Sequence, residues 1–209
     1  CGILSAFIND VDPEMVYAQL VYGYAKENDL LIAADGGYEH LKKAGMAPDL
    51  LIGDFDSMEK PNVSCETITL PVEKDDTDIV FAVKEGFRRG YTRFVIFGGL
   101  GGKRISHTIA NMQLLEYVAI QGGTARLIGG TTSLFLLSCG QSYVFEQETG
   151  KELSLFSITP TASVTLQGVK YPVTKATLER CFPLGVSNRV LEPTAALTVH
   201  SGTILVVIE

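Results

Sequence analysis

The sequence predicts an α/β domain followed by a smaller all-β domain, and two observations support this division. In the first half, continuous apolar runs typical of parallel strands covered on both faces alternate with helical segments. From about Thr132 onward, apolar and polar residues alternate, as in strands with one buried face. We therefore expect a mostly parallel sheet flanked by helices over residues 1–131 and an all-β domain over residues 132–209.

Three apolar runs of the first half, residues 30–34, 50–52 and 94–97, each stop at glycine or aspartate. Such strand ends are where open α/β sheets bind ligands. Between them, capping signals such as Asp12 before Pro13 and C-terminal glycines at 45 and 90 predict helices. The expected helices are residues 15–28, 38–44, 77–89 and 106 to about 121.

The second half contains two pairs of alternating runs that predict hairpins. Residues 143–145 and 153–156 flank a turn at 148–151, and residues 197–200 meet 203–208 across Ser201-Gly202. Residues 164–166 alternate in the same way. The polar segment 185–189 is expected to be a loop.

Composition excludes several classes of function. The formal net charge of −7, with only short basic clusters, argues against a nucleic-acid partner, and no apolar run reaches membrane-spanning length. The 4 cysteines lack CxxC spacing, which indicates neither a zinc site nor a disulfide framework. We expect reduced thiols and a cytoplasmic protein.

Acidic residues follow two apolar segments of the first half. Asp54 and Asp56 end the run 50–52, and the acidic segment 74–78 follows Leu70-Pro71-Val72 and opens a helix, where Asp76 or Thr77 is the N-cap. Together with Asp35, these carboxylates would repel one another unless a cation compensates them, and Mg²⁺ held by carboxylates and substrate phosphates is the usual solution. A capped turn with solvated acids remains the alternative.

A glycine-rich segment, residues 98–102, follows the run 94–97 and precedes a helix. Glycines allow backbone N–H groups to approach a phosphate, which Lys103 and Arg104 can neutralise. The segment differs from a P-loop, because the spacing before the lysine is one residue short. A tight turn with solvated basic residues is the alternative, and His107 is either a helix cap or functional.

These motifs, in this order, resemble the thiamine pyrophosphokinase family. The matching segments run through nearly the whole chain: 35–37, 53–57, 75–78, 101–111, 168–172 and 185–188. The resemblance implies an α/β domain that binds ATP and Mg²⁺, a β-sandwich domain that binds thiamine, and a homodimer whose active site lies between subunits. The implied reaction moves the pyrophosphoryl group of ATP to the hydroxyl of thiamine, giving thiamine diphosphate and AMP.

The resemblance also implies a role for each matched residue. Mg²⁺ would be held by Asp54, Asp56 and Asp75, and these three with Arg104, a phosphate ligand, form the implied catalytic set. The nucleotide and phosphate site would be lined by Asp35, Gly36, Thr77, Asp78, Gly101, Gly102, Lys103, His107 and Asn111. Thiamine would be contacted by Ser187 and Asn188. Two departures from the family pattern are Lys103, an apparent insertion, and Ser106, which stands where the family commonly has aspartate.

Two functions of other classes remain open. A phosphohydrolase could use Asp54 as nucleophile and Asp56 as acid, but that pattern expects Thr or Val two residues later, where this chain has Met58. A thiamine or nucleotide sensor without catalysis would keep Ser187 and Asn188 and would need no paired acids.

Overall fold

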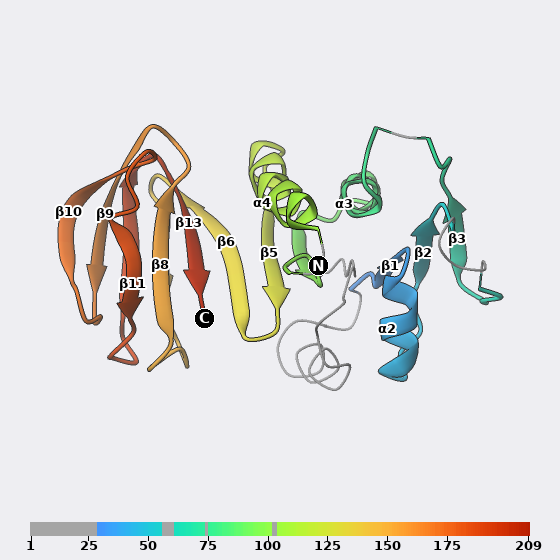
Figure 1. Cartoon of the computed structure of the whole chain (residues 1–209), viewed down its shortest axis with the longest axis horizontal. Coiled ribbons are helices and arrows are strands. Elements are labelled where there is room, and N and C mark those ends of the chain that lie inside the picture. Colours follow the sequence, from blue (N-terminus) through green and yellow to red (C-terminus); the bar gives the residue numbers. More distant parts are fainter. Residues whose placement is uncertain (1–28, 56–60, 74, 102–103) are drawn as a thin grey trace. The chain divides into compact units, whose positions relative to one another are not determined.

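The computed structural model describes residues 29–55, 61–73, 75–101 and 104–209. The chain divides into two compact units, Cys1–Gly130 and Thr131–Glu209, and Figure 1 shows helices in the first and strands throughout the second. The helix expected at residues 15–28 lies outside the described residues. None of the helices within the described ranges is long and apolar enough to cross a membrane.

The described strands of the first unit pair in parallel. One sheet has the order β1 (Ile32–Ala34), β2 (Leu50–Gly53) and β3 (Glu66–Thr69), and β4 (Arg93–Phe97) pairs with β5 (Thr124–Gly129). The three apolar runs are therefore strands, as the sequence predicts. Every residue of β1 and β2 is buried, which explains why both segments are continuously apolar.

Three helices of this unit are described, and their ends follow the capping signals of the sequence. They are α2 (Gly37–Lys43), α3 (Asp78–Arg88) and α4 (Ile105–Ile120). Thr77 is the N-cap of α3, since its Oγ1 accepts a hydrogen bond from Val80 N at 3.4 Å. Gly45 and Gly90, with φ of 69° and 88°, take the left-handed conformation just beyond α2 and α3.

A cluster of buried apolar side chains joins five of the described elements of this unit. Its fully packed members come from β1, α2, β2, β4 and β5: Ala33, Leu41, Leu51, Phe97 and Ile128. Because every residue of β1 and β2 is buried, these two strands can carry polar side chains only where they end. Packing in this core therefore fixes the positions of the ends of β1 and β2, which Asp35 and Asp54 follow directly.

An ion-pair network also fixes α3. Glu85, only 7% exposed, accepts hydrogen bonds of 2.7 Å from Arg88 and from Arg89, and Arg89 also donates to Glu66 of β3 at 2.6 Å. The hydrogen bonds from Arg88 and then from Arg89 lower the pKa of Glu85 to about 2, against the opposing effect of burial. Arg89 thus joins the last turn of α3 to the sheet.

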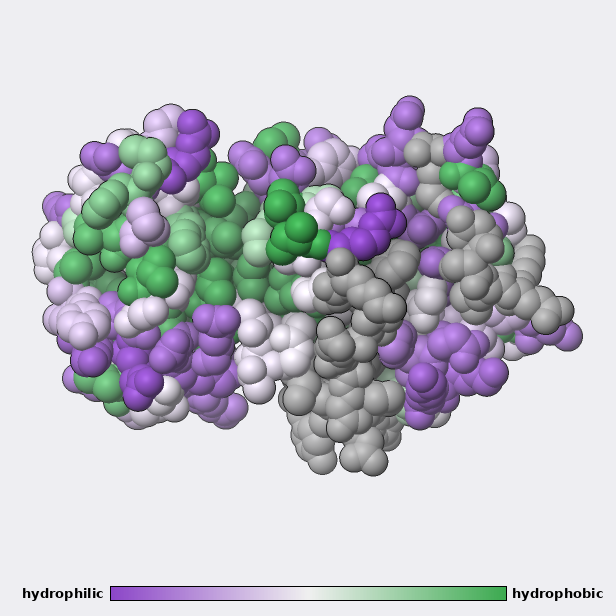
Figure 2. Space-filling view, viewed as in Figure 1, coloured by the Kyte–Doolittle hydropathy of each residue, from purple (hydrophilic) through white to green (hydrophobic). Residues whose placement is uncertain are grey.

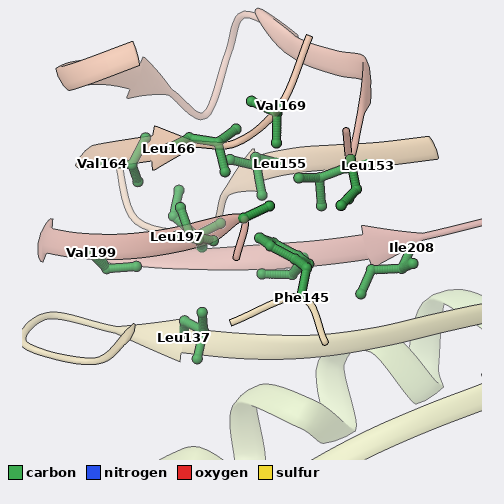
Figure 3. Close-up of a cluster of buried hydrophobic side chains, with 14 of the residues drawn as sticks. Leu137, Phe145, Leu153, Leu155, Val164, Leu166, Val169, Leu197, Val199 and Ile208 are labelled. Carbon is green, nitrogen blue, oxygen red and sulfur yellow. The ribbon is translucent and has the colours of Figure 1, made fainter. Parts of the chain in front are cut away.

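The second unit consists of strands in two antiparallel sheets. Its strands are β6 (Thr132–Ser138), β7 (Ser142–Val144), β8 (Glu152–Ser157), β9 (Thr161–Gln167), β10 (Val173–Glu179), β11 (Gly185–Arg189), β12 (Ala196–Ser201) and β13 (Thr203–Ile208). Within this unit, one sheet has the order β10-β9-β12-β7 and the other β11-β8-β13-β6. Leu155 and Leu166, from different sheets, meet in the apolar core shown in Figure 3.

Both hairpins predicted for this unit are wrong, although the strands exist. β7 pairs with β12, whereas β8 pairs with β11 and β13, so the turn at 148–151 connects the two sheets. β12 and β13 also lie in different sheets, and the chain changes sheet at Gly202. Gly202 has φ of 73°, and a Cβ there would lie 2.5 Å from Thr159 Oγ1, so only glycine fits this crossing.

The loop expected at 185–189 is also wrong. This segment is strand β11, which pairs antiparallel with β8 and contains an irregular register between Gly185 and Asn188. Ser187 lies within the irregularity with φ of 60°. The strand was not predicted because most of its side chains are exposed, so its sequence does not alternate between apolar and polar residues.

Candidate active site

The carboxyl ends of β1 and β2 bring Asp35 and Asp54 to one edge of the sheet. The register places Ala34 beside Ile52, and Asp35 N donates to Ile52 O at 2.7 Å. A Cβ on Gly53 would lie 3.3 Å from Asp35 Cα, so glycine permits the two chain segments to approach closely. The sequence prediction that acids of neighbouring strands share an edge is confirmed for this pair.

The backbone takes the left-handed conformation at Asp35 and directly after Asp54. Asp35 has φ of 44° and is 5% exposed, and its carbonyl accepts a hydrogen bond from Tyr38 N at 3.1 Å as α2 begins after Gly36. Phe55, directly after the half-buried Asp54, has φ of 56°. Left-handed conformations cost non-glycine residues about 1–2 kcal/mol, and such strain concentrates at ligand sites.

The acidic segment before α3 divides into residues with different environments. Asp75 is exposed, and Asp78 at the first position of the helix is buried. Asp76 accepts a hydrogen bond from Lys84 at 2.6 Å, which raises the pKa of that lysine. The hydroxyl of Thr77 serves the helix N-terminus, so this threonine and not Asp76 is the N-cap that the sequence left undecided.

The described residues do not by themselves assemble a metal site. Within the described ranges, no group of three or more His, Cys, Asp or Glu side chains is close enough to hold a metal ion. Asp56 lies outside those ranges, so the DxD pair is described only through Asp54. Its chemistry nevertheless suits Mg²⁺, which needs only one or two carboxylates when substrate phosphates supply further oxygens.

The glycine-rich segment connects β4 to α4. Gly98 and Gly101 have φ of 70° and 79°, and Gly98 N donates to Ile128 O of β5 at 3.0 Å. The carbonyls of Gly99 and Gly101 accept side-chain hydrogen bonds from α4, at 2.8 Å and 3.2 Å. Gly102 and Lys103, both expected at the phosphate site, lie outside the described residues.

Arg104 directly precedes α4 and is exposed. It is the N-cap residue with φ of −119°, its carbonyl accepts from His107 N at 3.0 Å, and no side chain caps the helix at this position. Ser106 is also exposed, and His107 is half-buried. An exposed guanidinium at the start of a helix can pair with a phosphate without displacing a protein partner.

Two side chains of α4 donate hydrogen bonds to the glycine-rich segment. Asn111, expected to contact substrate, is 5% exposed and donates through Nδ2 to Gly99 O. Thr108, which sequence reasoning did not select, donates to Gly101 O. Their spacing of three residues places them on one face of the helix, and this is the signal that could have indicated a shared role.

In the second unit, the side chain of Asn188 binds the backbone of a neighbouring segment. Its Oδ1 accepts from Tyr171 N at 3.0 Å, and its Nδ2 donates to Tyr171 O at 2.9 Å. Ser187 is exposed, and its backbone N–H donates to Ser154 Oγ at 3.1 Å. Tyr171 is itself 56% exposed and was not selected from the sequence. Asn188 therefore holds Tyr171, and Ser187 presents its side chain to solvent.

Comparison with known families assigns both units. The family model described as "Thiamin pyrophosphokinase, catalytic domain" matches residues 21–125, and "Thiamin pyrophosphokinase, vitamin B1 binding domain" matches residues 142–204. The chain belongs to the thiamine pyrophosphokinase family. The resemblance inferred from the motifs is confirmed, and thiamine pyrophosphokinase is an enzyme that uses ATP.

Individual thiamine pyrophosphokinases are similar over most of this chain. The Bacillus subtilis (strain 168) protein is 27% identical over 192 residues, which cover 88% of this chain and 89% of that protein. The crystal structure of an Enterococcus faecalis family member has a TM-score of 0.79 at 28% identity, covering 100% of this chain and 98% of that one. The Bacillus subtilis crystal structure has a TM-score of 0.83 at 24% identity and covers 99% and 96%, which supports the fold.

Proposed function

We propose that this thiamine pyrophosphokinase transfers the pyrophosphoryl group of ATP to the hydroxyl of thiamine, giving thiamine diphosphate and AMP. The observation that carries the proposal is the order of the two family matches, catalytic and then vitamin B1 binding, along a chain with two compact units. The left-handed backbone conformations of Asp35 and Phe55, just after β1 and β2, and the exposed Arg104 support a phosphate site in the first unit.

The first unit would provide charge neutralisation and alignment. Asp54, Asp56 and Asp75 would hold Mg²⁺, which when bound offsets phosphate charge. Arg104 would pair with phosphate oxygens through its planar fork, beside the turn formed by Gly98 to Gly101. The remaining residues proposed to line the nucleotide site are Asp35, Gly36, Thr77, Asp78, Gly102, Lys103 and His107.

The reaction requires positioning more than covalent catalysis by the protein. A new bond forms between the thiamine hydroxyl oxygen and the β-phosphorus of ATP, and the bond from the β-phosphorus to the oxygen bridging it to the α-phosphorus breaks. AMP leaves with that electron pair, and the hydroxyl proton is released. Arg104 stabilises the charge that shifts between the phosphate oxygens, and a fixed loop keeps the attacking and leaving oxygens aligned.

The second unit would bind thiamine through the segment of β11 that contains Ser187 and Asn188. Since the amide of Asn188 already binds the Tyr171 backbone, Ser187 offers the more accessible hydrogen-bonding side chain. Asn188 would then act by keeping this segment in place. The left-handed conformation of Ser187 is backbone strain of the kind that concentrates at ligand sites, which supports this assignment.

A homodimer with its active site between subunits is part of the proposal. Apolar residues gather on one face of the second unit in Figure 2, and large exposed apolar side chains of this unit include Phe182 and Leu184, each 62% exposed. Sedimentation should show a dimer, and dilution should lower specific activity. A fully active monomer would contradict the shared site.

We also propose a cytoplasmic location, supported by the free thiols of Cys65, Cys139 and Cys181.

Product analysis tests the function directly. The purified chain is incubated with ATP, Mg²⁺ and thiamine, and parallel reactions omit thiamine or Mg²⁺. We expect AMP and thiamine diphosphate in equal amounts only in the complete reaction. ADP would indicate an ordinary kinase, inorganic phosphate a phosphohydrolase, and ligand binding without any product a sensor.

A further inference from the structure

Two buried side chains of α4 hold the glycine-rich segment 98–101 by its carbonyl groups. Asn111 Nδ2 donates to Gly99 O at 2.8 Å, and Thr108 Oγ1 donates to Gly101 O at 3.2 Å. Asn111 is 5% exposed and Thr108 is 9% exposed. Because Gly99 is itself buried, its carbonyl requires a protein partner, which the Asn111 amide supplies.

The segment also packs tightly against β5 and α4. A Cβ on Gly99 would lie 3.0 Å from Leu127 Cδ2 and 3.4 Å from Asn111 Nδ2. A Cβ on Gly129 would lie 2.8 Å from Leu100 Cβ. The absence of side chains at these two glycines therefore allows the segment to reach the hydrogen-bonding groups of α4.

The hydrogen bond from Asn111 determines the orientation of the peptide group between Gly99 and Leu100. In a trans peptide the C=O and the following N–H point in opposite directions. The Gly99 carbonyl points to Asn111, so the N–H of Leu100 points away from that side chain. Removing the Asn111 amide would release this peptide and permit it to rotate.

We propose that Asn111 and Thr108 are positioning residues of the phosphate site. They hold the carbonyls of Gly99 and Gly101 on α4, so that the backbone N–H of Leu100 and the side chain of Arg104, which precedes the same helix, keep a fixed arrangement toward the phosphates of ATP. This inference rests on the proposed function. It gives Asn111 a role through the loop, in place of the substrate contact that the motif resemblance implies.

The test compares variants that remove the hydrogen bonds with a variant that retains one. Thr108→Val removes the hydroxyl at nearly constant volume, Thr108→Ser keeps it, and Asn111→Leu removes the amide. The measurements are the affinity for ATP by displacement of a fluorescent ATP analogue in the presence of Mg²⁺, and kcat and KM for both substrates. Gln113→Leu, an exposed position on α4, is the matched control.

We expect Thr108→Val and Asn111→Leu to weaken ATP affinity or lower kcat/KM for ATP by about 10- to 100-fold, as for other groups that orient a ligand-binding residue. The KM for thiamine should change by less than about twofold, since these residues act on the glycine-rich segment proposed to face ATP and not on the thiamine-binding unit. Thr108→Ser should recover most of the loss, and Gln113→Leu should behave as the unmodified chain.

Three results would overturn the inference. The first is unchanged ATP affinity and kinetics in variants that only lose stability to urea, which indicates a purely structural role. The second is a Thr108→Ser variant as impaired as Thr108→Val, and the third is an equal rise in KM for thiamine. The ATP affinity is measured without turnover, so it does not depend on product formation. If the unmodified chain binds ATP but forms no AMP, the proposed function is rejected. The ATP affinities of the variants still test the positioning role of Thr108 and Asn111.

Discussion

The two units place polar residues in different parts of their strands. In the first unit, β1 and β2 are buried along their whole length, and the acids follow at the strand ends. In the second unit, β9 alternates between buried and less buried residues, and β11 carries Ser187 and Asn188 within the strand. A strand covered on both faces can offer polar groups only at its ends, whereas a strand with one outer face can offer them along its length.

This difference separates the residues whose substitution should change activity from the residues whose substitution should change the free energy of unfolding. In the first unit, substitutions at the strand ends should change activity and leave the core intact. In the second unit, substitutions at alternate positions should affect either the shared core of the two sheets or the outer face. The following predictions test this separation.

The largest effect is expected for Asp54→Asn. A neutral amide binds Mg²⁺ poorly, so turnover should fall on the order of 10³-fold, about 4 kcal/mol of transition-state stabilisation. The midpoint of urea unfolding should stay close to that of the unmodified chain, because Asp54 follows the buried part of β2. Asp76→Asn, at an acid paired with Lys84, is the control and should keep most activity. Near-normal turnover of Asp54→Asn at saturating Mg²⁺ would remove the metal assignment.

Leu197→Ala should be the most destabilising of these substitutions. Leu197 is fully buried in the core of the second unit, where truncation leaves a cavity and costs about 2–5 kcal/mol in the free energy of unfolding. Leu191→Ala, at a leucine that is 52% exposed, is the control and should cost less than about 0.5 kcal/mol. Urea denaturation followed by circular dichroism compares the two, and equal midpoints would contradict the assignment of Leu197 to the core.

Arg104→Lys tests the phosphate contact. Lysine keeps the charge but loses the paired geometry of the guanidinium, so the loss should be about 1–3 kcal/mol in transition-state stabilisation. Lys103→Ala should cost less if Lys103 only adds positive charge. Steady-state kinetics for ATP decide between the two residues. A severe defect in Lys103→Ala beside a mild defect in Arg104→Lys would identify Lys103 as the ligand.

The smallest effect is a pH-dependent contribution of Glu85 to stability. Because the pKa of Glu85 is about 2 in the folded chain and 4.5 is its ordinary value, its carboxylate stabilises the fold above pH 4.5, and this stabilisation is lost as pH falls toward 2. Glu85→Gln should therefore lower the free energy of unfolding at pH 7 by about 1–2 kcal/mol, discounted because Arg88 is mostly exposed. The difference from the unmodified chain should shrink between pH 5 and pH 3. A difference that is constant over this range would exclude the ion pairs as its cause.

The sequence predicts the first unit well where strands are fully buried. A continuous apolar run such as 50–52 has few other interpretations, and its end fixes the position of Asp54. β3 (Glu66–Thr69) was not predicted, because this short strand has no buried residue and therefore no apolar run. The loop contacts of Thr108 and Asn111 were also not predicted, since they depend on the path of the backbone between Gly98 and Gly101.

In the second unit, the sequence predicts strands but not their partners. Alternation shows that a segment has one buried face, yet it does not show which sheet the segment joins. The short connection at Gly202 resembles a hairpin turn, and only the strand pairing in the structure shows that the chain crosses between sheets there. The roles of the proposed site residues remain predictions, and Asp56, Gly102 and Lys103 among them lie outside the described residues.

The central place of β13 in its sheet has a consequence for folding during synthesis. β13 lies between β6 and β8, and its residue Ile208 pairs with Ser133 at the start of β6. On the ribosome, β6 and β8 therefore remain without their shared neighbour until residues 203–208 have left the exit tunnel. The first unit needs none of these late residues for its own strand pairs, so we expect it to acquire protease resistance earlier in translation than the second.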